Sequence, residues 1–192
     1  MIYGSVLAAV VSALAAEAID NTSKQAWQKL YEPGRADGRD LATLGRSIEE
    51  GRITRRDADC WVFARLHSQL KPRHWDVLVA KYSTHKARKV QSIGRLHPLI
   101  ASHAPRLFII NAVTAWAIPK LKGADGKRSS DMIVLPVEFY DINRWDPEAR
   151  PERTRRRWRK AIDDVLEGME EEALDAAEII LVNEGLAIKS AA

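Results

Sequence analysis

Residues 154–185, TRRRWRKAIDDVLEGMEEEALDAAEIILVNEG, decide the fold because they predict a long helix near the C-terminal end of the sequence. Their apolar side chains recur at intervals of three and four positions, which is the period of an α-helix. The apolar stripe consists of Trp158, Ile162, Val165, Met169, Ala173, Ala176 and Ile180. We expect one helix, or two helices joined near Gly168, in a mainly α-helical fold.

Shorter segments with the same period precede this stretch, and prolines, glycines and capping residues separate them. We expect Thr54 to begin one of these helices and Pro98 to interrupt another. The expected helices cover about residues 5–19, 21–30, 41–49, 54–70, 74–82, 86–103 and 105–116. Residues 132–137 are the only β-like run, and Pro136 makes them an edge strand or extended chain.

The 192 residues suffice for one domain or two small ones with a sizeable core. The breaker-rich segment KGADGK at 122–127 suggests a boundary. We therefore expect a helical domain at 1–121 that includes a helix-turn-helix-like region at about 74–117. A linker with an extended segment should follow at 122–150, and an Arg-rich and then acidic helical region at 151–192.

The start of the C-terminal helix is strongly basic. Residues 150–160, RPERTRRRWRK, hold seven cationic side chains and one anion. The planar guanidinium of arginine fits phosphate groups and the guanine edge, so this run predicts a contact with DNA or RNA. Thr154 is expected to cap the helix and Trp158 to anchor the core. Arg159 can pair with Asp163, and Lys160 can pair with Asp164. The candidate binding residues are Arg153, Arg155, Arg156, Arg157, Arg159 and Lys160.

A second basic region spans residues 71–106, where eight cations oppose the single anion Asp76. Short helices, polar connectors and a basic face are features of a groove-reading helix-turn-helix module. Its expected DNA contacts are Lys81, Lys86, Arg88, Lys89 and Arg95. A helical hairpin with a purely structural role is the alternative.

Residues 161–184 reverse this charge, with nine carboxylates and no lysine or arginine. A phosphate polymer attracts the two basic regions and repels this one. The distribution of charge is therefore better evidence about a nucleic-acid partner than the net charge of +4. The acidic segment is a solvated face, a mimic of nucleic acid or a docking surface for a basic protein.

Signatures of enzymes and metal sites are weak in this sequence. The histidines and the single Cys60 lack the spacing of a zinc site, and no nucleotide-binding glycine loop or nucleophile elbow occurs. We expect no catalytic residues, no metal and no cofactor; a small nuclease using Glu138 and Asp141 is the enzyme alternative. The lone cysteine fits a reducing cytosol. The apolar run at residues 1–18 has no lysine or arginine before it, as a signal peptide would require, so we expect it to form a buried or partner-facing helix. We also expect a cytoplasmic protein without a membrane partner.

Three segments together resemble the phage and prophage late-gene regulators of the Q-type antiterminator family, and the related AlpA-type regulators of lysis genes. They are residues 74–121, the extended segment at 132–140, and the Arg-rich helix around Arg153–Arg159. The resemblance is one of layout and length over roughly residues 70–185. The cysteine-rich zinc element of some Q families is absent, so the chain would belong to a zinc-free branch.

The resemblance implies a mechanism that the residues alone do not. Such regulators bind double-stranded DNA near a promoter, engage RNA polymerase with its sigma factor, and let the polymerase read through terminators. The 74–116 module would then hold DNA, and the Arg-rich helix would contact DNA or nascent RNA. Three alternatives stay open: a promoter-binding activator or repressor, a non-catalytic protein–protein adaptor, and a small nuclease.

Overall fold

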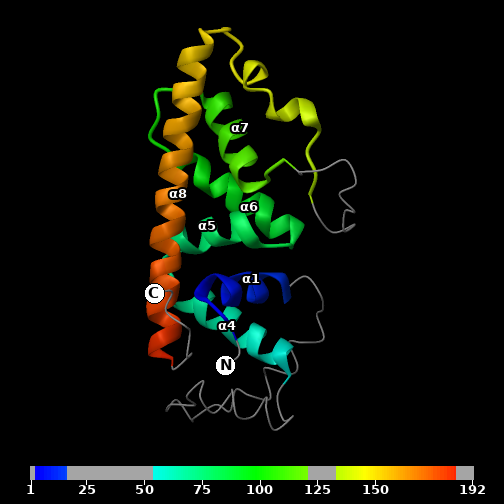
Figure 1. Cartoon of the computed structure of the whole chain (residues 1–192), viewed down its shortest axis with the longest axis vertical. Helices are drawn as coiled ribbons and strands as arrows, with labels where there is room; N and C mark the ends of the chain where they lie inside the picture. Colours follow the sequence, from blue (N-terminus) through cyan, green and yellow to red (C-terminus); the bar gives the residue numbers. More distant parts are fainter. Residues whose placement is uncertain (1–2, 17–53, 121–132, 185–192) are drawn as a thin grey trace. The chain divides into compact units, whose positions relative to one another are not determined.

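The computed structural model describes residues 3–16, 54–120 and 133–184, and these residues form a mainly helical fold without strands (Figure 1). This confirms the mainly α-helical prediction. The α-helices of the described ranges are α1 (Val6–Ala16), α4 (Arg55–Gln69), α5 (Pro72–Tyr82), α6 (Lys86–Leu96), α7 (Arg106–Ala117) and α8 (Glu152–Asn183). Short 3-10 helices are η1 (His97–Leu99), η2 (Val137–Tyr140) and η3 (Ile142–Arg144).

The chain divides into two compact units, of which the first comprises residues 1–71 and 173–192 and the second residues 72–172. We call the second the central unit and the first the terminal unit. The boundaries at 121 and 150 drawn from the sequence do not coincide with this division. The predicted helices at 21–30 and 41–49 and the linker at 122–127 lie outside the described residues.

In the terminal unit, α1 packs on α4 (Figure 1). Both helices bury small and branched apolar residues, and Tyr3 Oη donates a hydrogen bond to the buried Asp59 at 2.6 Å. As expected, Thr54 caps α4: its side chain accepts from the backbone N–H of Asp57, whose carboxylate accepts from the backbone N–H of Thr54. This capping box satisfies N–H groups that the first helical turn leaves without partners.

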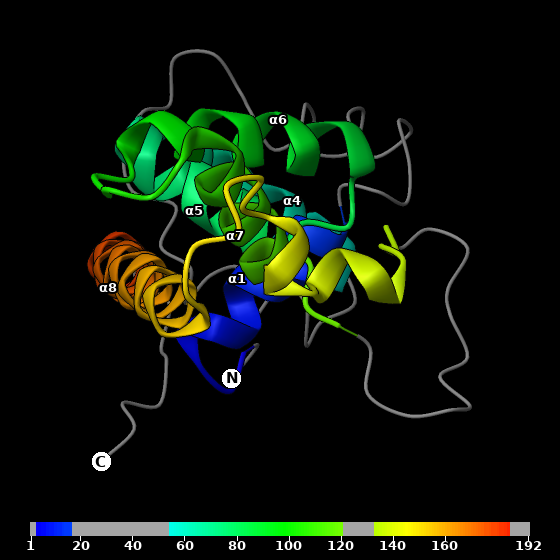
Figure 2. The same cartoon turned by 90° about the horizontal axis from the view of Figure 1, so that it is seen from above.

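In the central unit, α5, α6 and α7 pack on one another (Figures 1 and 2). Pro72 occupies the first turn of α5, where a missing N–H costs nothing. The helix α6 ends at Leu96 and continues as η1 through Pro98, so the predicted interruption is confirmed. The helix α7 begins directly after Pro105, as predicted.

The helix α8 runs without a break through Gly168, which excludes two separate helices. Two details of the prediction are wrong. The helix begins at Glu152, so Thr154 lies inside the first turn, and its N–H donates to the carbonyl oxygen of Pro151 at 2.9 Å. The fully buried positions are Ile162, Leu166, Ala173, Ala177 and Leu181. Over much of its length this stripe lies one residue after the apolar stripe that the sequence predicted. Apolar residues form two overlapping stripes on α8, and packing partners select between them.

The segment before α8 returns to α7 without forming a strand. Residues 133–136 are extended chain, η2 contacts α7, and Tyr140 Oη donates to the carbonyl oxygen of Ile118 at 2.8 Å. The ring of Phe108 on α7 meets Trp145 and Trp158 edge-on, with centroid distances of 5.4 and 5.6 Å. This aromatic cluster holds the start of α8 against α7, with Trp158 half-buried within it.

No helix in the described ranges has both the length and the apolar character needed to cross a membrane.

Candidate nucleic-acid interface

Helices α5 and α6 are joined by a three-residue turn, Ser83-Thr84-His85, which is the connection length of a helix-turn-helix. His85 caps α6, since its Nδ1 accepts from the backbone N–H of Arg88 at 3.4 Å. Ser83 Oγ in turn accepts from the backbone N–H of His85 at 3.1 Å. The N-cap of α6 is therefore a histidine, and the preceding serine fixes its backbone.

A buried carboxylate fixes α6 on α5. Asp76 of α5 accepts a hydrogen bond from Ser92 Oγ at 2.9 Å and one from the guanidinium of Arg95 at 3.3 Å. A buried anion is tolerated when charged and neutral donors satisfy it in this way. The one anion of the second basic region thus sets how α6 lies on the module.

The five cations predicted in this module separate into two groups. Lys86, Arg88 and Arg95 are exposed, and the Arg95 side chain keeps 55% of its surface accessible despite its ion pair. Lys81 instead lies over the Trp116 ring at 4.2 Å from its centroid and 3.8 Å from a Glu170 oxygen. Lys89 is partly buried, and its Nζ donates to the carbonyl oxygen of Lys81 at 3.0 Å. The first three residues can reach a ligand, whereas the other two support packing.

Burial, reinforced by the charge of Lys81, lowers the pKa of Lys89 to about 8. A lysine in this setting loses part of its charge under mildly basic conditions, which weakens its case as a phosphate contact.

The exposed face of α6 also contains residues that charge patterns alone do not select. Ala87, Gln91 and Gly94 are exposed and share one face at spacings of four and three. Small side chains there permit close approach to a groove, and a glutamine amide can pair with adenine. Only the observed exposure identifies Gln91 as a candidate base contact.

The six cations at the start of α8 also differ in what they contact. Arg156 pairs with Glu152 at 2.5 Å, and Arg159 pairs with Asp163 at 2.6 Å as expected. Arg159 also donates to the carbonyl oxygen of Ala112 on α7 at 3.1 Å, and Arg155 donates to that of Asn143 at 3.4 Å. These three arginines stabilise α8 and its packing.

The other three cations are Arg153, Arg157 and Lys160. All are exposed, and none has a hydrogen-bond or ion-pair partner among residues 3–16, 54–120 and 133–184. The pair of Lys160 with Asp164 expected from their spacing therefore does not form. Their spacing of four and three places them on one face of α8. We call these three residues the cationic row.

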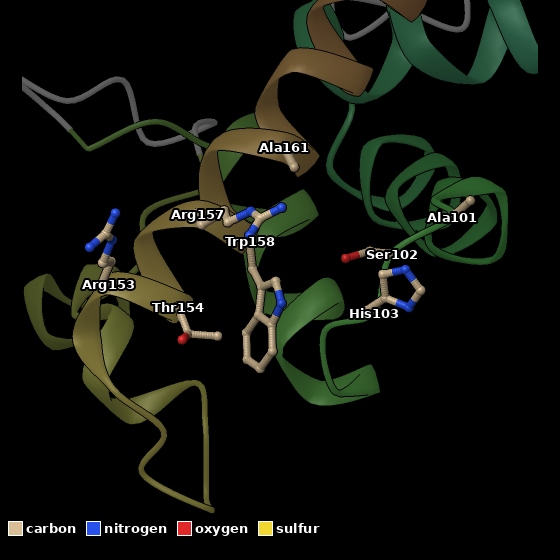
Figure 3. Close-up of a pocket in the computed structure, with 8 residues that line it drawn as sticks. All are labelled: Ala101, Ser102, His103, Arg153, Thr154, Arg157, Trp158 and Ala161. Carbon is tan, nitrogen blue, oxygen red and sulfur yellow. The ribbon is translucent and has the colours of Figure 1, made fainter.

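Part of the cationic row borders a pocket of about 440 Å³ in the central unit (Figure 3). One wall is the segment between η1 and α7, and the other is the first three turns of α8. Its lining residues are Ala101, Ser102, His103, Arg153, Thr154, Arg157, Trp158 and Ala161. Ser102 and His103 were missed by the sequence analysis because they carry no local motif.

No family model, curated protein or solved structure matches this chain.

Within the described ranges, no group of three or more His, Cys, Asp or Glu residues is placed to hold a metal ion. Asp141, which the sequence suggested as a ligand in the nuclease alternative, stabilises its own segment. It caps η3 by accepting from the backbone N–H of Asn143 at 3.0 Å.

Proposed function

We propose that this protein is a DNA-binding transcription regulator that acts as an antitermination factor. The observation that carries the DNA-binding part is the cationic row of Arg153, Arg157 and Lys160. Three neighbouring cations without partners in the described ranges form a local positive field. Binding to DNA releases the counterions that surround its phosphates, and this release favours such a contact.

The α5–turn–α6 module supports the same proposal and gives it a reading element. Asp76 and the His85 cap orient α6, and its exposed face combines Gln91 with flanking cations. In this arrangement Lys86, Arg88 and Arg95 position the helix on phosphates, while Gln91 reads a base edge. The cationic row, which lies in the same central unit, adds contacts to the DNA phosphate backbone.

The antitermination part of the proposal rests on the resemblance to Q-type antiterminators. Its partners are double-stranded DNA near a promoter and RNA polymerase with its sigma factor, with nascent RNA as a further contact. The acidic residues of α8 offer a surface of opposite charge for a basic region of the polymerase.

DNA binding is tested with duplex DNA from the protein's own upstream region, by fluorescence anisotropy over a series of salt concentrations. We expect the triple variant Arg153→Glu, Arg157→Glu, Lys160→Glu to bind weakly. We also expect it to reduce the salt slope by about 3, because each lost phosphate contact removes about 0.9.

The matched control is Arg56→Glu, Lys71→Glu, Lys120→Glu, which changes three exposed cations by the same total charge. An equal loss in both triple variants would show that only the net charge matters. A flat salt response of the unmodified protein would contradict DNA binding altogether.

Antitermination is tested in a purified transcription reaction with a promoter, the upstream region and a downstream terminator. We expect more read-through with unchanged initiation. Changed initiation with unchanged termination would instead identify a promoter-binding activator or repressor. No effect on either step, together with no DNA binding, would identify an adaptor.

A further inference from the structure

We infer that the pocket between residues 101–103 and α8 binds one phosphate group of the DNA backbone. This inference rests on the proposed function, and it adds a specific site to it. The pocket is separate from the exposed face of α6, so the protein would hold DNA at two places in the central unit.

The lining of the pocket offers cations and hydrogen-bond donors and no carboxylate. Arg157 lines the pocket together with Ser102, His103 and Thr154, and Arg153 borders it. Two anions on the same part of α8 are occupied, because Glu152 pairs with Arg156 and Asp163 pairs with Arg159. Asp164 is exposed and lies outside the pocket lining. The pocket therefore keeps an uncompensated positive charge, which is the environment that a phosphate requires.

The donors are carried on braced elements. Trp158 forms part of the wall, and it is fixed edge-on against Phe108 and beneath the guanidinium of Arg150 at 5.3 Å. Ser102 Oγ accepts from the backbone N–H of Ala104 at 3.2 Å, which leaves its own proton for another acceptor. Arg157 extends from α8 toward Ser102 and His103, whereas Arg153 points away from them (Figure 3). Arg157 is thus the central donor of the pocket.

The spacing of the cations favours a polymer over a small phosphorylated molecule. Arg153, Arg157 and Lys160 follow the axis of α8 over about 10 Å, at 1.5 Å per residue. Lys160 is exposed and lies outside the pocket lining. A single phosphate cannot satisfy a row of this length, whereas successive phosphates of a DNA strand can, with one of them seated in the pocket.

The test combines Arg157→Ala with DNA duplexes in which one phosphate at a time is a neutral methylphosphonate. We expect one position at which the neutral linkage weakens binding of the unmodified protein about tenfold but hardly affects Arg157→Ala, because both changes remove the same contact. His103→Ala should likewise reduce the effect of the neutral linkage at that same position. Arg156→Ala, an exposed neighbour already paired with Glu152, is the control and should respond like the unmodified protein.

Circular dichroism melting curves establish that each variant is folded. The inference is overturned if Arg157→Ala binds DNA as tightly as Arg156→Ala does, or if every neutral linkage affects both proteins equally. In either case DNA binding by the unmodified protein would still support the proposed function. Failure of the unmodified protein to bind duplex DNA, or binding to single-stranded RNA alone, would overturn both.

Discussion

At the scale of single residues, Lys89 shows how burial changes the part a cation can play. Its lowered pKa, about 8, lies well below the ordinary value of 10.5. Between these two pH values the unfolded chain binds more protons at this site than the folded protein does. The free energy of unfolding therefore rises with pH across this range, as Lys89 becomes neutral in the folded state.

We predict that Lys89→Met, which keeps a long side chain without its charge, removes this rise. Urea unfolding at pH 7, 8, 9 and 9.5 should show increasing stability for the unmodified protein and a flatter profile for the variant. The variant should also be the more stable of the two at pH 7. The pKa values of Tyr3 and Tyr82 are raised in the folded protein. Above about pH 10 the unfolded chain therefore loses tyrosine protons that the folded protein keeps, which lowers the free energy of unfolding, so the series stops at pH 9.5. Lys120→Met, at an exposed site, is the control; parallel profiles for all three proteins would contradict this account.

At the scale of elements, α8 is a 32-residue helix that carries a glycine in its interior. A Cβ built on Gly168 meets no heavy atom within 4 Å, apart from the backbone of its own helix and its chain neighbours. Glycine costs helical stability because the unfolded chain loses more freedom there on folding. No close packing contact in the described ranges requires a glycine at position 168 and offsets this loss of helix stability.

We predict that Gly168→Ala stabilises the protein by about 0.5–1 kcal/mol. Denaturant unfolding measures the change, which should appear as a higher midpoint with an unchanged slope. Gly4→Ala provides the comparison, because Gly4 is equally open but lies outside a helix and should change stability less. A destabilised Gly168→Ala variant would show that α8 is broken or bent at that residue.

At the scale of the whole molecule, positive and negative charges are segregated along one helix. The cationic row occupies the first turns of α8, and Asp164, Glu167 and Glu171 are exposed beyond it. An anionic polymer bound at the row feels the repulsion of these carboxylates over distances comparable with the Debye length. The acidic part of α8 therefore limits the affinity for DNA and its salt dependence.

We predict that Asp164→Asn, Glu167→Gln, Glu171→Gln tightens DNA binding several-fold at an ionic strength of about 0.05 M. The gain should vanish near 1 M, where the Debye length is about 3 Å. Anisotropy titrations at both salt concentrations measure the effect. Glu138→Gln, at an exposed acid outside α8, should show a smaller gain. A gain that persists at high salt would mean that these carboxylates act through direct contacts instead.

Local sequence signals place several of the described helix boundaries within a few residues, and the sequence shows how charge is distributed along the chain. Helix boundaries lie close to four residues that signal them in the sequence, Thr54, Pro72, Pro98 and Pro105. The signals are local, because a capping side chain and the missing N–H of proline each act within one helical turn. The pair of Arg159 and Asp163 could be anticipated for the same reason, since both residues lie on one helical turn.

Packing between helices selects which face of α8 is buried and which cations stay exposed without a partner in the described ranges. Arg159 reaches a carbonyl oxygen on α7, and Lys89 reaches one on α5, so each cation is engaged by a neighbouring helix. The pocket likewise joins His103 to Arg157 across more than fifty residues of chain. Burial and pairing depend on what packs against a side chain, and local sequence periodicity contains no information about that partner.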